Sequence, residues 1–262
     1  MPSRLFPALD EGVRRGLAEL QARLDAVFPL PRRFSAALPR DVAELSGLLT
    51  YSRSERPADY LNKPPLLSAY LRYFLPWNVY RLARLLPALP LALKDGDAVT
   101  DIGSGPLTLP LALWIARPEL RGISLEFRCL DRAGAALDAG KRLFAALTGA
   151  GGSEGAGPWR IKTIRAGLGS PIRGQRAALV TAVQVLNEVS GGSFRGNAVP
   201  AARYADMLVS LAAPSGAILA VEPGIPASGE LIALLRDALM SRGFPPVAPC
   251  PHEGHCPMLR GK

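Results

Sequence analysis

The sequence predicts an α/β protein in which a doubly wound parallel sheet is preceded by an N-terminal helical domain. Three observations support this fold class. From about residue 97 onward, short apolar strands alternate with helices, which is the order of a parallel sheet with crossover helices. Two of these strands, 178–186 and 217–221, are almost wholly apolar, as expected of strands covered on both faces. The first strand runs directly into a glycine turn, where such a sheet binds its ligand.

Residues 1–95 are predicted to form the helical domain. Apolar side chains recur at steps of three and four residues from Leu9 to Val27, which indicates an amphipathic helix. Asp41 is expected to be the N-cap of the next helix. Further helices are expected over 41–51, 66–74 and 78–86. Pro76 is expected to bend or end the helix over 66–74, because proline lacks the N–H that a helix interior needs.

Residues 96–247 are predicted to form the sheet domain, and residues 248–262 a Cys/His-rich segment. Strands are expected over 98–102, 123–130, 159–164, 178–186 and 217–221, and helices over 107–116, 133–147, 201–211 and 229–242. The longest apolar run, 85–93, is too short to span a bilayer, and the N-terminus has no apolar core of signal-peptide length. We therefore expect no membrane association.

The chain is strongly basic, with 31 basic and 22 acidic residues and a net charge of +9. A basic protein of this kind favours a polyanionic partner, and RNA is the natural candidate. The alternative is an arginine-rich surface that is merely solvated. Three cysteines cannot form a disulfide framework, so a reducing, cytoplasmic location is expected.

The turn after the first strand reads Thr100-Asp-Ile-Gly-Ser-Gly-Pro106. Its two glycines allow a tight turn and a close approach of the backbone to a ligand, and Pro106 suits the first helical position. A nicotinamide fingerprint would need glycine at Thr108, and the Gly-Lys-Ser/Thr of a phosphate loop is absent. The remaining acidic–x–Gly–x–Gly form resembles the first motif of class I S-adenosylmethionine-dependent methyltransferases.

The charges of S-adenosylmethionine favour a carboxylate beside the glycine turn, and its ribose favours a second one at the end of the next strand. Asp101, Gly103 and Gly105 are predicted to hold the methionine end, and Asp131 the ribose. Their neighbours Ser104 and Arg132 complete the predicted cofactor site. The alternative is an ordinary strand–turn–helix with two turn glycines.

Two further segments follow strand ends at the same edge of the sheet. In amino-methylating enzymes, the position of Leu186-Asn-Glu-Val189 carries a polar residue that orients the target nitrogen. Asn187 and Glu188 are therefore the predicted catalytic residues, although local capping of a turn is the alternative. Glu222, after the fifth strand, either closes the substrate mouth or anchors a Pro-Gly turn.

Both histidines and two of the three cysteines lie in Cys250-Pro-His-Glu-Gly-His-Cys-Pro257. Thiolates and imidazoles are ligands for zinc, and thiolates for iron–sulfur clusters. Ligands so close in sequence cannot easily surround one ion tetrahedrally. A zinc site would therefore use two or three of Cys250, His252, His255 and Cys256 with an external ligand. A proline-bounded loop without metal is the alternative.

Residues 96–257 resemble the methyltransferase-like proteins of the mitochondrial small ribosomal subunit and their bacterial relatives. The resemblance rests on the Asp-Ile-Gly-Ser-Gly turn, Leu-Asn-Glu, Glu-Pro-Gly and, most specifically, the Cys-Pro-His…Cys-Pro segment. It implies a class I methyltransferase fold that binds S-adenosylmethionine. It also implies a role on small-subunit rRNA or in assembly of that subunit.

The same resemblance implies a 4Fe-4S cluster held by four cysteines, of which Cys250 and Cys256 match the first two. The family's remaining two follow later, and this sequence stops at Lys262 before either. The metal segment is therefore expected to be incomplete, through truncation or degeneration, unless it holds zinc. Cys129 is interpreted as a small core residue and not as a substitute ligand.

The predicted function is S-adenosylmethionine-dependent methyl transfer to an RNA nucleophile. Catalysis would depend mainly on proximity and orientation, because a sulfonium methyl is already strongly electrophilic. A target base would have to be single-stranded or flipped out of its helix. The alternative is a non-catalytic ribosome-assembly factor that binds RNA and keeps the fold. A small-molecule methyltransferase is disfavoured by the charge.

Overall fold

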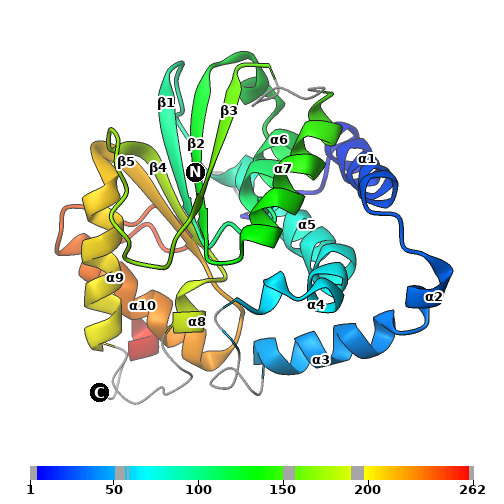
Figure 1. The fold of residues 1–262 in the computed structure, drawn as a ribbon. Coiled ribbons are helices and arrows are strands. Elements are labelled where there is room, and N and C mark those ends of the chain that lie inside the picture. Colours follow the sequence, from blue (N-terminus) through cyan, green and yellow to red (C-terminus); the bar gives the residue numbers. More distant parts are fainter. Residues whose placement is uncertain (1–4, 51–56, 58, 150–156, 190–197, 260–262) are drawn as a thin grey trace.

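The computed structural model describes residues 5–50, 57, 59–149, 157–189 and 198–259 of the 262-residue chain. Its centre is a five-stranded sheet with the order β3-β2-β1-β4-β5 (Figure 1). The strands are β1 (Asp97–Ile102), β2 (Leu125–Asp131), β3 (Trp159–Arg165), β4 (Ala177–Val183) and β5 (Ala212–Val221). Every neighbouring pair is parallel. The predicted α/β fold with a doubly wound parallel sheet is confirmed, since strand order reverses between β1 and β4.

One face of the sheet is covered by α6 (Thr108–Ala116) and α7 (Gly134–Thr148), with α1 (Glu11–Val27) and α5 (Leu75–Leu85) packed against them (Figure 1). The core on this face contains an aromatic cluster around Trp159, whose ring centroid lies 4.8 Å from that of Phe127 and 5.1 Å from that of Trp114. The indole Nε1–H of Trp159 donates to the Leu120 carbonyl at 2.9 Å. Its one polar group is therefore satisfied where the ring is fully buried.

The opposite face is covered by α9 (Ala198–Leu211) and α10 (Pro226–Met240) (Figure 1). Apolar residues of β1 and β4, such as Ile102 and Val180, pack there against Leu208 and Leu231. A single helical turn, α8 (Leu186–Val189), follows β4. None of the helices in the described part of the chain has the length and hydropathy to cross a membrane.

The N-terminal helices share their core with the sheet. The elements not yet named are α2 (Arg32–Ser35), α3 (Leu38–Thr50), η2 (Tyr60–Asn62), α4 (Pro64–Ala69), the π-helical η3 (Tyr70–Phe74), and the short 3₁₀ turns η4 (Leu86–Ala88), η5 (Pro118–Gly122) and η6 (Pro257–Leu259).

The N-terminal helix α1 contributes directly to this shared core. Val13, Leu20 and Leu24 of α1 belong to the same apolar cluster as the sheet residues beneath α6 and α7. Burial of this apolar stripe explains the three- and four-residue periodicity seen in the sequence.

Two expectations for this region are corrected. Asp41 is not an N-cap, because α3 already begins at Leu38 and Asp41 lies in its first turn. Pro76 does not end a helix, because η3 leads directly into α5 and Pro76 occupies its first turn. The wider π-helical turn before Pro76 accommodates the proline, as π-bulges do inside longer helices.

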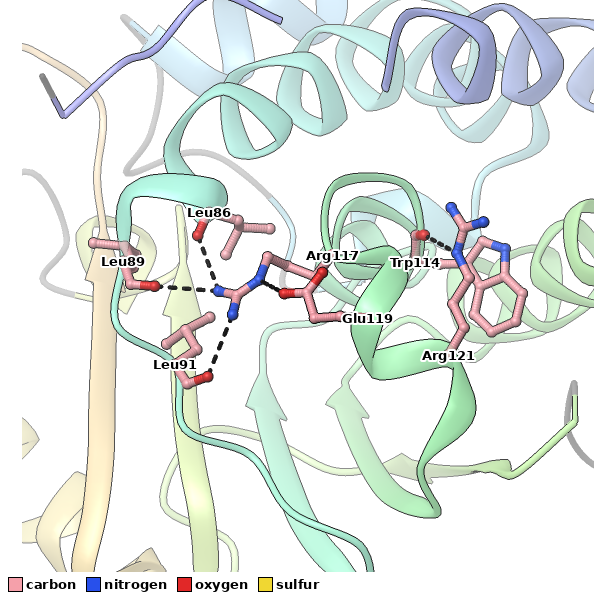
Figure 2. Close-up of polar contacts among 7 residues, drawn as sticks. All are labelled: Leu86, Leu89, Leu91, Trp114, Arg117, Glu119 and Arg121. Atoms are coloured by element: carbon pink, nitrogen blue, oxygen red, sulfur yellow. Dashed lines mark hydrogen bonds and ion pairs between the residues drawn. The ribbon is translucent and has the colours of Figure 1, made fainter. Parts of the chain in front are cut away.

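Arg117, at the end of α6, holds the segment that connects α5 to β1 (Figure 2). Its Nη1 donates to the carbonyls of Leu86 and Leu89, both at 3.2 Å, and its Nη2 to that of Leu91 at 3.4 Å. Its Nε pairs with Glu119. One planar guanidinium thereby satisfies three backbone carbonyls of the connection.

Replacing Arg117 with alanine is expected to lower the free energy of unfolding by about 3 kcal/mol, because hydrogen bonds to a charged donor are lost and carbonyls are left unpaired. Arg117→Lys should recover only part of it, since an ammonium cannot fork to three carbonyls. Urea denaturation would measure both. Arg121→Ala is the control, because within the described part of the chain the Arg121 guanidinium donates to one backbone carbonyl, from Nε to that of Trp114 (Figure 2). An equal loss in Arg117→Ala and Arg121→Ala would contradict the role of the fork.

Candidate functional site

A cavity of about 360 Å³ opens at the carboxyl ends of β1, β2 and β4. Its walls come from the glycine turn, from residues 130–133 at the end of β2, from 166–168 after β3 and from 183–185 at the end of β4. Tyr60, Leu61 and Tyr70 of the N-terminal helices complete it. Its position is the one where open parallel sheets bind ligands, beside the point where strand order reverses.

The glycine turn needs both of its glycines, for different reasons. Gly103 and Gly105 have φ of +68° and +52°, the left-handed region that side chains disfavour. A Cβ on Gly103 would also lie 2.4 Å from a methyl of Val185, whereas a Cβ on Gly105 would meet nothing within 4 Å. Gly103 is therefore required by packing, and Gly105 keeps the cavity wall bare.

Pro106 is not at the first helical position, so that prediction is wrong. The turn continues through Leu107, which has a φ of 59°, and α6 begins at Thr108. Close packing of α7 accompanies this longer turn. A Cβ on Gly140 of α7 would lie 2.5 Å from the carbonyl carbon of Pro106. Only a glycine at this position lets α7 approach the turn so closely.

Asp131 lies at the end of β2 and lines the cavity. One of its carboxylate oxygens accepts the N–H of Gly105 and the other that of Ala133, both at 2.8 Å. Burial raises the pKa of Asp131 above its ordinary value, against the effect of these hydrogen bonds. A carboxylate has about four acceptor sites, so Asp131 retains acceptor capacity toward the cavity. Arg132, beside it, also lines the cavity.

Asp101 lies behind the glycine turn and is outside the cavity lining, as is Ser104. It is almost completely buried and accepts two hydrogen bonds, from Ser104 Oγ at 2.5 Å and from Thr181 Oγ1 at 2.6 Å. Burial raises the pKa of Asp101 to about 6. Its position suits bracing of the turn against β4, whereas direct contact with a cofactor would require it to line the cavity.

This burial predicts a pH effect on stability. Because the pKa of Asp101 is raised from 3.8 to about 6, the folded state binds more protons than the unfolded state between these values. Stability contributed by this group therefore falls as pH rises through that window. Asp101→Asn keeps hydrogen-bonding capacity without the charge. At pH 7.5 we therefore expect its free energy of unfolding to exceed that of the wild type by roughly 1–3 kcal/mol. Near pH 4 the variant and the wild type should have the same free energy of unfolding. If urea denaturation gives the same difference between them at pH 4 and at pH 7.5, the prediction is contradicted.

Asn187 is buried and takes part in a different contact from the predicted one. Its Nδ2 donates to Glu222 Oε2, and the N–H of Leu186 donates to Glu222 Oε1 at 2.8 Å. Burial raises the pKa of Glu222. These bonds tie the end of β5 to the start of α8, and Asn187 is not part of the cavity lining. Glu188 belongs to α8, but its side chain lies outside the described residues.

Gln184 is the polar residue that β4 actually brings to the cavity. It has a φ of 56°, unusual for a residue other than glycine, and its N–H donates to the Val221 carbonyl at 2.6 Å. Its Nε2 donates to Asn78 Oδ1 at 3.0 Å. Strained polar residues of this kind are concentrated at functional sites. No local pattern pointed to Gln184, because it lies inside the predicted strand 178–186.

The tyrosines of the N-terminal helices were not predicted from the sequence as residues of the site. Tyr60 of η2 and Tyr70 of η3 wall the cavity from above the strand ends. Asn62 fixes η2 to α7, because its Oδ1 accepts the N–H of Ala135 at 3.1 Å. Asn78 donates to the Tyr70 hydroxyl at 3.4 Å, which connects this wall to Gln184. The helices that precede the sheet are therefore part of the site.

The Cys/His-rich segment is attached to α10 by Arg236, whose Nη2 donates to the carbonyls of His252 and Gly254. Cys250 is exposed, Cys256 is half-buried, and neither forms a disulfide. Over the described residues, no three Cys, His, Asp or Glu side chains are grouped so that they could hold a metal ion. This donor set does not fit a complete site, so metal binding by Cys250 and Cys256 stays a prediction. Cys129 is fully buried in the core, as expected.

A family model described as mitochondrial small ribosomal subunit Rsm22 matches residues 84–262, more than half of the chain. The chain belongs to the Rsm22 family. The match begins within α5 and includes the whole sheet, the cavity residues at the strand ends and the Cys/His-rich segment, but not Tyr60, Leu61 and Tyr70. Among curated proteins, no match to this Rsm22-family chain is found.

Several solved methyltransferases share parts of this architecture. An S-adenosylmethionine-dependent methyltransferase from Geobacter sulfurreducens, in complex with S-adenosyl-L-homocysteine, has 18% identity and a TM-score of 0.36, over 55% of this chain and 47% of that one. One from Thiobacillus denitrificans, in the same complex, has 20% identity and a TM-score of 0.37, over 59% and 54%. One from Leishmania major has 13% identity and a TM-score of 0.42, over 73% and 72%.

The Rsm22-family chain thus spans about half the length of the first two of these proteins. With identities of at most 20% and TM-scores below 0.5, these structures do not assign the residues of the site. The strand order and the family match identify the fold. The activity, substrate and partners are proposed below from the geometry of the site.

Proposed function

We propose that this Rsm22-family chain binds S-adenosylmethionine in the cavity and transfers its methyl group to RNA of the small ribosomal subunit. The observation that carries the proposal is Asp131. Its carboxylate lines the cavity at the end of β2 and is oriented by the N–H groups of Gly105 and Ala133. A fixed acceptor beside a bare glycine turn suits a ribose diol.

The other walls are compatible with the rest of this ligand. The cavity volume of about 360 Å³ lies within the range of small-molecule sites. Gly103 and Gly105 leave room for the methionine end, and the small residues Ala166 and Gly167 border the side next to Asp131. When bound, S-adenosylmethionine supplies an electrophilic methyl group on a sulfonium. The protein would supply orientation and exclusion of water.

The orienting role falls to residues that line the cavity near β4 and the N-terminal helices. Tyr60 and Tyr70 would exclude water from the site. Gln184 is held by Asn78 through its Nε2, so its side-chain carbonyl oxygen is the group with acceptor capacity for a target N–H. It takes the orienting role predicted for Asn187, whose amide bonds to Glu222.

The proposed partner is supported by the family and by charge. The family is named for the mitochondrial small ribosomal subunit, and the net charge of +9 suits binding to rRNA. A second candidate is a non-catalytic assembly factor of that subunit. It is favoured by Asn187, because the polar residue expected to act on the target has a structural contact instead.

Two measurements test these candidates. Calorimetry would determine binding of S-adenosylmethionine, and a radiolabelled methyl group would be followed into small-subunit RNA that lacks methylation. Binding with transfer is the expected result. Binding without transfer to RNA or to immature subunits, together with co-sedimentation with those subunits, would support the assembly factor. Absence of S-adenosylmethionine binding would overturn the proposed activity.

A further inference from the structure

Three exposed side chains form a stripe along η3 and α5, here called the aromatic stripe: Tyr73, Trp77 and Arg81. They follow one another at steps of four residues, so they lie on one side of the helical run. Tyr73 is 49% and Trp77 50% exposed, and Arg81 is also exposed. Two neighbouring aromatic residues left half open to solvent indicate an interaction surface.

Both rings are held in place before any partner binds. The ring of Tyr73 lies edge-to-face against Phe74, with centroids 5.1 Å apart. That of Trp77 lies edge-to-face against Tyr80, with centroids 5.9 Å apart. Nη1 of Arg81 donates to Asn78 Oδ1 at 3.1 Å. A partner would therefore meet a prearranged surface, with little loss of side-chain entropy on binding.

The chain segment that carries the aromatic stripe has basic residues but no acidic ones, although its Arg72 pairs with Asp25 of α1 at 3.0 Å. From Lys63 to Lys94 the sequence contains two lysines and three arginines and no acidic residue. Exposed aromatic rings beside an arginine are features that bind single-stranded nucleic acid, with bases stacked on the rings and phosphates near the cation.

The aromatic stripe follows directly on a residue of the cavity wall. Tyr70 precedes Tyr73 by three residues in the same helical run and lines the cavity wall. Asn78, which binds Arg81, also accepts from Gln184 and donates to the Tyr70 hydroxyl. One buried amide thus connects an exposed arginine, a tyrosine of the cavity wall and the polar residue at the end of β4.

We propose that the aromatic stripe binds unpaired nucleotides of RNA by stacking on Tyr73 and Trp77, with Arg81 at a phosphate. RNA held there lies next to the cavity, where an unpaired base is the form of substrate that a base-modifying site requires. The choice of RNA as partner rests on the proposed function. The stacking surface itself rests on the exposure, spacing and charge of these residues.

Trp77 provides a direct signal for the test. The chain has three tryptophans, of which Trp159 is fully buried and Trp114 packs against it. Intrinsic fluorescence would be followed while a twelve-nucleotide single-stranded RNA is added to the full chain. We expect quenching, and a duplex of the same length should quench far less, because its bases are already stacked. Trp77→Phe should remove the quenching but keep affinity within about threefold, since phenylalanine still stacks.

Affinity would be measured in parallel by anisotropy of labelled RNA. Tyr73→Ala and Trp77→Ala should each weaken binding roughly tenfold. Arg81→Ala should reduce the slope of log affinity against log salt by about one. Phe34→Ala is the matched control, because Phe34 is 51% exposed and also lies beside an arginine, Arg33, at 4.8 Å. It should leave RNA affinity unchanged.

The proposal is overturned if Trp77→Ala and Phe34→Ala bind RNA equally well, or if RNA leaves the fluorescence unchanged. It is also overturned if the alanine variants lose only the binding of a ribosomal protein from purified subunits. Calorimetry with S-adenosylmethionine on the same preparations separates this result from the proposed function. If the wild type binds S-adenosylmethionine but RNA does not quench its fluorescence, the aromatic stripe alone is contradicted. If RNA quenches the fluorescence but S-adenosylmethionine does not bind, the cofactor site alone is contradicted.

Discussion

Replacing Asp131 with alanine is expected to weaken S-adenosylmethionine binding by about 100-fold or more. Two ribose hydroxyls would lose a charged acceptor, and a hydrogen bond to a charged group contributes roughly 1.5–3 kcal/mol. The substitution also leaves the N–H of Gly105 without the partner that it has at 2.8 Å. Calorimetry of the purified variant measures the change in affinity.

Two further variants make this result specific. Asp138→Ala removes an exposed carboxylate from α7, outside the cavity lining, and should bind like the wild type. Asp131→Asn keeps the size of the side chain but presents N–H groups to at least one backbone donor, so it should bind nearly as weakly as the alanine variant. Equal affinity in Asp131→Ala and the wild type, with both folded by circular dichroism, would remove Asp131 from the cofactor site.

Gly103→Ala is expected to lower the free energy of unfolding by about 3–5 kcal/mol. Part of this loss comes from a side chain at a φ of +68°, which costs roughly 1–2 kcal/mol. The larger part is overpacking, because the added Cβ would lie 2.4 Å from Val185 Cγ2 and 2.5 Å from its Cβ. Urea denaturation measures the total change.

Gly105→Ala separates the two contributions. Its φ of +52° imposes a similar backbone strain, but no atom lies within 4 Å of the added Cβ. We expect a loss of only about 1–2 kcal/mol, together with weaker S-adenosylmethionine binding, because Gly105 lines the cavity. Equal destabilisation by the two substitutions would show that contact with Val185 does not matter.

The strands illustrate how far local pattern can be trusted in this chain. Four of the five were predicted within about three residues at each end, because apolar runs between turns are local signals. The fifth, predicted over 217–221, begins already at Ala212. The fourth was extended too far, to residue 186, since Val185 and Leu186 continue its apolar composition. Gln184 leaves the strand with a left-handed backbone, and its contacts with Val221 and Asn78 come from segments 37 and 106 residues away in sequence.

The glycine turn was likewise predicted in part, and the rest of its structure depends on tertiary contacts. Gly103, Gly105 and Asp131 were placed correctly at one edge of the sheet, because parallel strands bring their carboxyl ends together. The end of the turn was predicted wrongly, since proline is common at the first position of a helix and Pro106 was placed there. Leu107 adopts a left-handed conformation and Gly140 of α7 packs against Pro106, and neither fact has a local sequence signal.

The sequence by itself determined the fold class, the glycine turn with Asp131 in register, and a basic chain suited to a polyanion. These depend on periodicity, spacing and composition, which are properties of neighbouring residues. Only the tertiary structure decided that Asp101 braces the turn, that Asn187 bonds to Glu222, and that Gln184 faces the cavity. It also brought Tyr60 and Tyr70 over the strand ends. The physical reason is that the direction and partner of each side chain are set by segments distant in sequence, which pack together only in the folded chain.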